Sequence, residues 1–303
     1  MLDKKIFRLI KEKDFLSMSP LQIRPFDWSC LEIYDSYYVR NRLNEYNSKF
    51  DLLHWMSFWT EKKRIVSPFK GNIKFENLKN KSSSAHQEVF SFLFDQDIVK
   101  KKIHFGYDIY NANDAFIISK FCKNYNFVLD FGSGYGRLGA MFAYKETNKT
   151  YISVDCIEAT YILQNLFLSL LKPKSFYEYF DYQFLNKEFK IQKKNSIYHI
   201  PTWKLDLIQN KTIDLITGIF VLPEINEFAL MNFINEAKRI LRIGGYIYLR
   251  DHLYQTGENN HKGCHKLNTE NELAKAGFEL IFKGKYKDNI EIYGTPRIYR
   301  KIK

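Results

Sequence analysis

The sequence predicts an α/β fold: a doubly wound, mostly parallel sheet with a C-terminal antiparallel hairpin, joined to a mainly helical N-terminal region. Three observations support this prediction. From about residue 106 onward, short apolar segments typical of strands alternate with segments of helical periodicity. A glycine-rich segment at 132–139 covers the turn from the first predicted strand into the start of the first predicted helix. The last two apolar segments follow each other with no helical pattern between them.

Each element follows from its apolar pattern and its flanking turn residues. The predicted strands are 126–131, 150–155, 195–200, 212–222, 245–251, 278–286 and 290–300. The predicted helices between them are 137–146, 159–171, 226–242 and 270–278. Thr269 and Glu272 have the spacing of a capping box and are expected to open the last helix.

The first part of the chain differs from the rest. Residues 4–16 and 36–63 have apolar residues at helical spacing, whereas "SPFKGN" (67–72) and "KNKSSSAH" (79–86) are turn or linker signals. We therefore predict two regions: a mainly helical N-terminal region over 1–105 and an α/β domain over 106–303. From its position, the N-terminal region is expected to cap the functional site of the α/β domain and to bind the substrate there.

Composition restricts the class of protein. The chain of 303 residues shows neither a signal peptide nor a run approaching the ~20 apolar residues that span a bilayer. Its four cysteines are widely spaced, which indicates free thiols in a reducing cytoplasm. The net charge of +12 suits nucleic acid, anionic lipid or an acidic small substrate, but the basic residues are scattered, as on solvated faces.

The segment "VLDFGSGYGRLGAMF" (128–142) fits two cofactor motifs. Gly134, Gly136 and Gly139 spell the G-x-G-x-x-G of a dinucleotide-binding loop. In the other register, Asp130 followed by Gly132, Gly134 and Gly136 spells D-x-G-x-G-x-G, the loop that holds S-adenosylmethionine. In the second register the acid ends the strand. An acid there offsets the positive charge of S-adenosylmethionine but repels a pyrophosphate. Asp130 therefore favours S-adenosylmethionine over NAD.

A second acid is expected at the end of the second strand, facing the ribose hydroxyls. Asp155 lies nineteen residues after Gly136, which is the spacing of one strand–helix–strand step. Glu158 is a weaker candidate, one turn later. Asp155 does not discriminate between the two cofactors, and a helix N-cap is its structural alternative.

Four segments in order, "VLDFGSGYGRLG", "YISVDC", "TIDLITGIFVLPEI" and "AKRILRIGGYIYLRD", resemble class I S-adenosylmethionine-dependent methyltransferases. The resemblance covers roughly residues 106–303 and implies a Rossmann-like fold, with Gly244 and Gly245 turning the chain out of a helix before the fifth strand. More narrowly, "LDFGSGYGRLG" with "IPTW" and "VLPEIN" is similar to sugar O-methyltransferases of bacterial surface-glycan pathways.

The resemblance also implies contacts with the donor. The loop residues would hold its amino acid part, Trp203 would stack on adenine, Phe220 and Val221 would face the methyl group, and Tyr107 would belong to a lid with Gly106 and Tyr110. Core packing is the alternative for the tryptophan and the tyrosines. The expected donor-binding residues are Tyr107, Asp130, Gly132, Ser133, Gly134, Tyr135, Gly136, Arg137, Asp155, Cys156, Trp203, Phe220 and Val221.

The acceptor decides which catalytic group is needed. A sugar hydroxyl must lose a proton as it attacks, so a general base is expected at the carboxyl ends of the strands. Glu224 follows the fourth strand, and Asp251 with His252 follows the fifth. A helix-terminal acid and an ordinary loop histidine are the alternatives for Glu224 and His252. "HKGCHK" (261–266) has zinc-ligand types without a further cluster, so no metal is expected.

The predicted function is O-methylation of an anionic sugar nucleotide or glycan in surface-glycan biosynthesis. Four alternatives stay open: methylation of RNA through a basic surface, N-methylation of a small molecule, an NAD-dependent reaction, and a binding module without catalysis. Amino methyltransferases of DNA bases resemble one another in an N/D-P-P-Y/F loop after the fourth strand. This chain has "GIFVLPEIN" there, which argues against such an acceptor.

Overall fold

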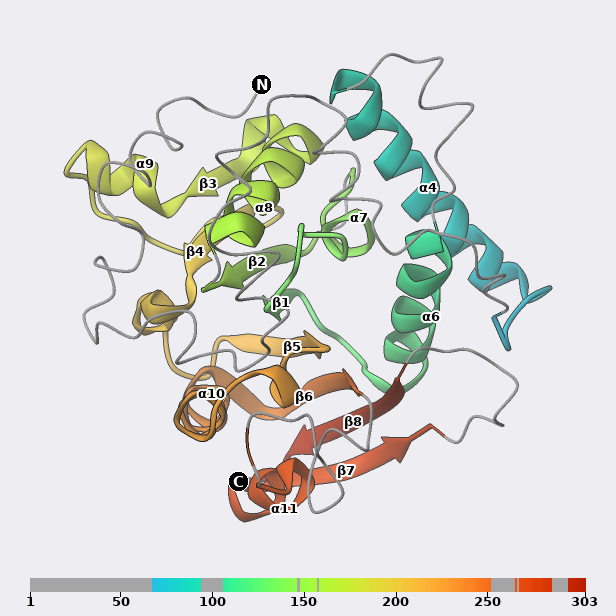
Figure 1. Ribbon diagram of the computed structural model, residues 1–303, viewed down its shortest axis with the longest axis vertical. Helices are drawn as coiled ribbons and strands as arrows, with labels where there is room; N and C mark the ends of the chain where they lie inside the picture. Colours follow the sequence, from blue (N-terminus) through green and yellow to red (C-terminus); the bar gives the residue numbers. More distant parts are fainter. Residues whose placement is uncertain are drawn as a thin grey trace.

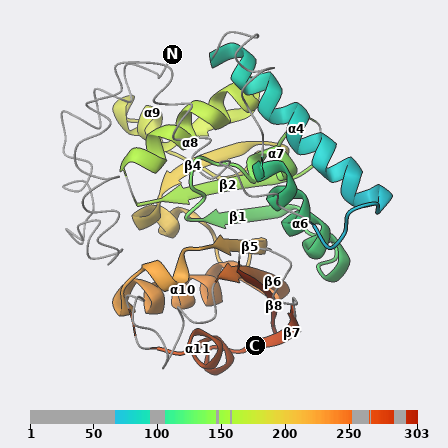
Figure 2. The ribbon, with the colours of Figure 1, turned by 45° about the vertical axis from the view of Figure 1, so that its right-hand side comes forward.

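The computed structural model describes residues 67–93, 106–145, 148–156, 158–251, 265, 267–284 and 294–303. Within them the strands form one eight-stranded sheet with the order β3-β4-β2-β1-β5-β6-β8-β7, which Figures 1 and 2 show as the centre of the molecule. The strands are β1 (Phe127–Phe131), β2 (Thr150–Asp155), β3 (Phe176–Glu178), β4 (Ile197–Pro201), β5 (Ile213–Ile219), β6 (Leu241–Asp251), β7 (Phe278–Lys283) and β8 (Thr295–Lys301).

Most of the sheet is parallel. Neighbouring strands from β3 through β6 pair in parallel, whereas β8 pairs antiparallel with both β6 and β7. The predicted fold class is therefore confirmed, with one detail added: the C-terminal antiparallel pair is placed so that β8 lies between β6 and the edge strand β7.

Helices cover both faces of the sheet (Figures 1 and 2). Residues of α4, α6, α7 and α8 enter one buried cluster, and residues of α9, α10 and α11 enter the other, which α8 also borders. The helices are α4 (Ile73–Leu93), α6 (Gly106–Phe121), α7 (Gly139–Phe142), α8 (Glu158–Leu171), α9 (Tyr179–Phe184), α10 (Glu227–Ile240) and α11 (Thr269–Lys275), with short 3₁₀-helices η3 (Pro173–Ser175), η4 (Thr202–Leu207) and η5 (Leu222–Glu224). Within the described ranges, every helix is too short or too polar to cross a bilayer.

The central strands are buried along almost their whole length because both faces of the sheet are covered. All six residues of β2 are buried, as are all five of β4 and the first six of β5. Strands buried on both faces read as continuous apolar runs rather than as alternating ones. The strands were therefore predictable from short, mostly apolar segments, although each contains one or more polar residues.

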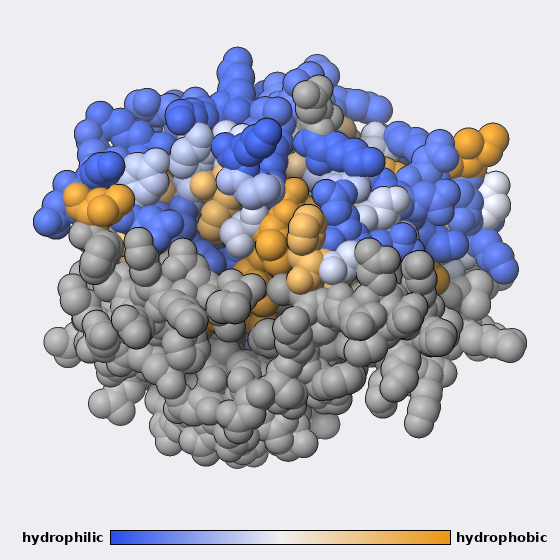
Figure 3. Space-filling model, turned by 90° about the horizontal axis from the view of Figure 1, so that it is seen from above, coloured by the Kyte–Doolittle hydropathy of each residue, from blue (hydrophilic) through white to orange (hydrophobic). Residues whose placement is uncertain are grey.

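The described surface is largely polar on the face seen in Figure 3. Viewed from above the orientation of Figure 1, the coloured residues are largely hydrophilic and a narrow strip of hydrophobic residues lies near the middle (Figure 3). Single exposed apolar side chains also occur on the helices, such as Ile73 at the start of α4 and Phe228 in α10. Scattered apolar residues of this kind are normal on a globular protein.

The glycine pair before the fifth predicted strand lies elsewhere than expected. Helix α10 ends at Ile240 and β6 starts directly at Leu241, so Gly244 and Gly245 lie inside the strand. The register between β5 and β6 shifts near this point, and Gly244 has a left-handed φ of 76°. The glycines therefore form an irregularity in the strand and do not end the helix.

Three further expectations were wrong. Helix α7 is a single turn, because Ala143 already leaves the helical conformation (φ −121°) and the left-handed Lys145 (φ 60°) follows it. The short edge strand β3 was not expected, so 195–200 forms the fourth strand in chain order rather than the third. The capping box is absent, because Asn268 caps α11 and accepts hydrogen bonds from Glu270 N (3.0 Å) and Asn271 N (3.2 Å).

Residues 79–86, interpreted as a linker, lie inside α4. Their polar residues are helical because tertiary contacts use them: Ser82 and His86 are fully buried beside Ala85. The preceding turn at 67–72 is confirmed, and Asn72 Oδ1 accepts from Lys74 N and begins the helix. The helical predictions at 4–16 and 36–63 lie outside the described residues.

Gly245 should be far less replaceable than its neighbour Gly244. A Cβ on Gly245 would lie 2.9 Å from Arg242 O and 3.0 Å from Asp214 O, whereas the nearest atom to one on Gly244 is Arg300 Nη2 at 3.7 Å. We expect Gly245→Ala to lower the free energy of unfolding by about 2–3 kcal/mol through overpacking. Gly244→Ala should cost only about 1 kcal/mol of left-handed strain. Urea unfolding of both variants tests this, and equal losses would contradict it.

Candidate functional site

The candidate site lies where the parallel strands end. In a doubly wound sheet this carboxyl edge is where ligands bind. The strand ends bring together the turn after β1, Asp155 at the end of β2, the turn after β5 and Asp251 at the end of β6. Residues that are far apart in the sequence thus meet at one edge.

The glycine loop after β1 is built from left-handed residues: Gly132 (φ 67°), Gly134 (φ 62°) and Gly136 (φ 85°). Their roles differ. A Cβ on Gly132 would lie 2.4 Å from Val221 Cγ2 and one on Gly136 3.0 Å from Leu168 Cγ, so these two are required by packing. A Cβ on Gly134 would meet nothing within 4 Å. Gly134 therefore faces open space, as a residue that contacts a ligand must.

Asp130, the first acid of the motif, is buried behind this loop. Its Oδ2 accepts a hydrogen bond from Tyr151 OH (2.6 Å) and its Oδ1 accepts one from Thr217 Oγ1 (2.7 Å). Burial raises the pKa of this carboxyl. Both oxygens thus have partners within the sheet. Asp130 therefore connects β1, the strand that precedes the loop, to β2 and β5.

Asp155 ends β2 beside the loop. Its Oδ1 accepts from Cys156 N (2.9 Å) and its Oδ2 accepts from Gln164 Nε2 (2.9 Å), so the carboxylate is held in one orientation. Burial, followed by the charge of Asp155, raises the pKa of Cys156 well above its ordinary value. Trp203 follows β4, which pairs with β2 so that Pro201 lies opposite Asp155. The predicted adenine and ribose residues therefore share one part of the edge.

The side chains of the loop contact protein groups. Tyr135 OH lies 2.8 Å from His86 Nε2, and His86 Nδ1 lies 2.8 Å from Asp108 Oδ1. Ser133 Oγ contacts Ser153 Oγ. These contacts connect the loop to α4, α6 and β2. Tyr135, which is expected to contact the donor, joins the loop to α4 through His86.

Arg137 also points to helix α6, where it contacts Asn111 and the buried Asp114. Asp114 also accepts from Arg250 Nε (2.7 Å) and from Tyr248 OH (2.6 Å). One carboxylate thus neutralises part of the charge of two arginines from the loop and β6. A buried network of this kind is stabilising only while every member is satisfied.

The turn after β5 adjoins the loop. Val221 contacts the position of Gly132, and Phe220 takes a left-handed φ of 57°, which is rare for a bulky residue. Phe220 N donates to Arg250 O (3.1 Å), and the Arg250 guanidinium lies 5.0 Å from the Phe220 ring and 5.3 Å from the Tyr110 ring. Strained backbone of this kind often marks functional sites.

Two of the three predicted catalytic residues are described. Glu224 ends η5 and is half-buried. Asp251 ends β6, is fully buried, and accepts from Arg297 Nη2 (3.0 Å) through Oδ2. Within the described residues, Asp251 Oδ1 has no hydrogen-bond partner. Burial raises the pKa of Asp251 to about 6 even with Arg297 beside it. His252 and the side chain of Tyr107 lie outside the described residues.

Three supporting residues were not predicted: Gln164, His86 and Asp114. Each is fully buried. A signal existed only for Gln164, which is a long polar residue within the apolar helix "ATYILQNLFLSLL". Nothing local in the sequence distinguishes His86 or Asp114 from surface residues.

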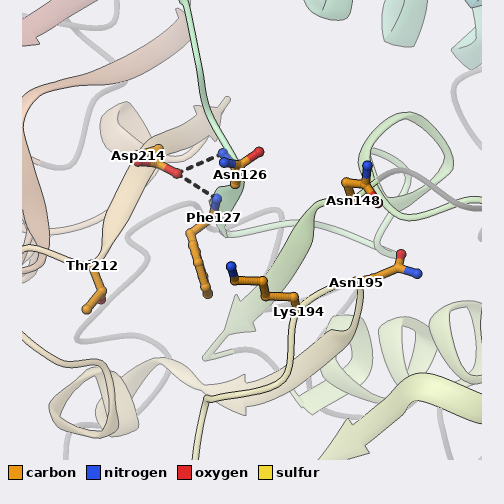
Figure 4. Close-up of a pocket in the computed structure, with 7 residues that line it drawn as sticks. All are labelled: Asn126, Phe127, Asn148, Lys194, Asn195, Thr212 and Asp214. Atoms are coloured by element: carbon orange, nitrogen blue, oxygen red, sulfur yellow. Dashed lines mark hydrogen bonds between the residues drawn. The ribbon is translucent and has the colours of Figure 1, made fainter.

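A hollow of about 530 Å³ lies at the opposite edge of the sheet (Figure 4). Its walls come from the amino ends of β1, β4 and β5 and from the turn before β2. Asp214 there accepts from Asn126 N (2.7 Å) and Phe127 N (2.8 Å), which fixes the start of β1. The lining residues are Asn126, Phe127, Asn148, Lys194, Asn195, Thr212 and Asp214. This hollow is separate from the carboxyl edge and contains none of the predicted site residues.

Comparisons with known proteins gave structural neighbours alone. No protein-family model matches the chain, and no curated protein matches it. A SAM-dependent methyltransferase from Methanosarcina mazei is 15% identical over 61% of this chain and 97% of its own, with a TM-score of 0.39. A TehB-like SAM-dependent methyltransferase from Corynebacterium glutamicum is 14% identical over 73% and 100%, with a TM-score of 0.42. One from Aquifex aeolicus is 17% identical over 68% and 98%, with a TM-score of 0.40. Likenesses this weak assign no activity, so the function rests on the strand order and on the geometry of the carboxyl edge.

The raised pKa of Asp251 predicts a specific pH dependence of stability. Its folded pKa of about 6 exceeds the ordinary 3.8, so the folded state binds this proton more tightly than the unfolded state. Its contribution to stability should therefore rise as pH falls from 7 to 4.5, by about 2 kcal/mol. Urea unfolding at both pH values should show this rise in the wild type relative to Asp251→Asn. The exposed-residue control Glu188→Gln should follow the wild type, and parallel profiles for all three proteins would contradict the assignment.

Proposed function

We propose that this protein is an S-adenosylmethionine-dependent methyltransferase that methylates a hydroxyl group of a sugar or sugar nucleotide. One observation supports S-adenosylmethionine as the donor. The loop of three left-handed glycines leaves open space at Gly134, which we call the cradle, and Gln164 links Gly134 to Asp155. The fold also supports the donor, because β8 runs antiparallel between β6 and β7 in an otherwise parallel sheet, as expected for the resemblance. The acceptor rests on the resemblance of the sequence and on the net charge of +12.

The residues at the edge suit the parts of such a donor. Asp155 would accept hydrogen bonds from the ribose hydroxyls, because its carboxylate is already fixed by Cys156 N and Gln164. The backbone of the loop around Gly134 would contact the amino acid part. Trp203, half-buried after β4, would contact adenine. When bound, S-adenosylmethionine supplies an electrophilic methyl group on a sulfonium.

We infer that the side chains of the loop position the loop, whereas its backbone contacts the donor. Helix α7 has only one turn, so a helix dipole contributes little at this loop. Arg137 and Tyr135 hold the loop in place through Asp114 and His86. In this proposal they position the loop, and the backbone contacts the donor. Helix α4 precedes the predicted boundary at 105, so the N-terminal region would serve the donor site as well as capping the acceptor.

Catalysis of hydroxyl methylation would need a proton acceptor at the same edge. Asp251 is suited to this because a pKa of about 6 leaves it ionised at neutral pH yet able to bind a proton. Arg297 would keep its carboxylate oriented. Glu224 is the second candidate. Methylation of RNA is the alternative, and a steep fall of polynucleotide affinity with salt would support it.

Donor binding is the first test. Isothermal titration should show micromolar binding of S-adenosylhomocysteine and no binding of NAD. Gly134→Ala puts a methyl group into the cradle and should weaken binding more than tenfold, which is a loss above about 1.4 kcal/mol. Gly71→Ala is the matched control, because Gly71 also has a left-handed φ (86°) and open space but lies in a remote turn. Binding of NAD in place of S-adenosylhomocysteine would reject the proposal.

The base is tested separately. Asp251→Asn and Glu224→Gln should each be assayed for turnover of sugar nucleotides and for donor binding. If Asp251 is the base, Asp251→Asn should lower kcat by about 10²–10⁴-fold while donor affinity stays unchanged. The wild-type rate should fall as pH drops through about 6, where the carboxylate of Asp251 becomes protonated. Full turnover by both variants would exclude both residues.

A further inference from the structure

Gln164 occupies an unusual position for a polar residue. It lies on α8, is fully buried, and has apolar neighbours in sequence on its N-terminal side. A buried amide is costly unless its donors and acceptors are all paired. The contacts of Gln164 must therefore account for its presence.

All hydrogen-bonding positions of the Gln164 amide are used. Its Nε2 donates to Gly134 O (2.8 Å) and to Asp155 Oδ2 (2.9 Å). Its Oε1 accepts from Ser153 Oγ (2.8 Å) and lies 3.1 Å from His199 Nε2. A glutamine amide offers two donor hydrogens and two acceptor lone pairs, so none remains unused. One side chain thus connects the cradle of the loop to the acid at the end of β2.

The orientation of this amide is determined by its partners. Gly134 O and ionised Asp155 only accept hydrogen bonds, so the NH₂ group must face them and the carbonyl must face His199. His199 Nε2 then carries a hydrogen. His199 Nδ1 contacts Glu178 Oε2, and both side chains are fully buried. Glu178 is fixed in turn by Tyr161 OH (2.6 Å) and Asn165 Nδ2 (2.8 Å).

We propose that Gln164 is a positioning residue of the donor site. Its NH₂ group donates to both Asp155 and the Gly134 carbonyl and so fixes their positions relative to each other. The buried Glu178–His199 pair holds the amide in the orientation that allows both hydrogen bonds. The inference rests on the proposed function, in which Asp155 binds the ribose. It adds that recognition of the ribose hydroxyls depends on a residue of α8 and a pair from β3 and β4 that do not contact the donor.

The first experiment compares two ligands. S-adenosylhomocysteine and its 2′,3′-dideoxy analogue are titrated into wild type, Gln164→Met and the exposed-site control Gln183→Met. Methionine conserves volume but donates no hydrogen bond, so Gln164→Met should weaken S-adenosylhomocysteine roughly 10- to 100-fold, as expected for hydrogen bonds to a charged group. The ratio of the two dissociation constants, that of the dideoxy analogue over that of S-adenosylhomocysteine, should fall toward one. A general loss of folding would weaken both ligands alike, and an unchanged preference would overturn the proposal.

The second experiment needs no ligand. Nitrogen-15 NMR of the histidine rings, with His199→Gln to assign the signal, should show a hydrogen on His199 Nε2. A bare Nε2 would mean that the amide of Gln164 is reversed and would overturn the inference, even if the donor binds. If wild type binds no S-adenosylhomocysteine, the proposed function fails and with it the ribose role, whereas the NMR result still decides how Gln164 is held. The two failures are therefore distinguishable.

Discussion

The glycine loop after β1 must be held rigidly at the carboxyl edge of the sheet, and this constraint shapes much of the structure around it. Glycines permit the left-handed conformations but do not hold them. The restraint comes from buried polar side chains on two sides. His86 holds Tyr135 from α4, and Gln164 holds the carbonyl of Gly134 from α8. Helix α4 is thereby linked to the glycine loop, although it precedes the sheet in the chain.

Buried charge is the recurring cost of this arrangement. Asp114 lies between Arg137 and Arg250, Asp251 contacts Arg297, and Glu178 contacts His199. Removing one member of such a pair leaves an uncompensated charge, which destabilises far more than the pair itself stabilises. Because an unpaired partner is so costly, these networks favour the one arrangement of the chain in which every buried group has its partner. The same burial that makes Asp251 costly when ionised also raises its pKa to about 6.

Prediction from the sequence succeeded where a residue's environment follows from its neighbours in the chain. Strands β1, β2 and β5 were predictable as short, mostly apolar segments because both faces of the sheet are covered. Helix α10 was predictable from the helical period of its apolar residues. It failed where distant contacts override local signals. The serine-rich run at 79–86 is helical because Ser82 donates to Asp108 (2.6 Å) and His86 lies against Tyr135. Thr269 has the sequence spacing of a helix N-cap, but the side chain of Asn268 accepts the capping hydrogen bonds from the backbone.

The sequence by itself determined the order of most strands and helices, the position of the glycine loop and the placement of Asp155, because all of these depend on local spacing. Only the tertiary structure decided what each loop residue contacts. Asp130 turned inward to Tyr151 and Thr217, Arg137 turned to α6, and Gln164 became the link between loop and acid. The physical reason is that a buried polar group must find its partner wherever the fold brings one, and sequence spacing does not encode that meeting.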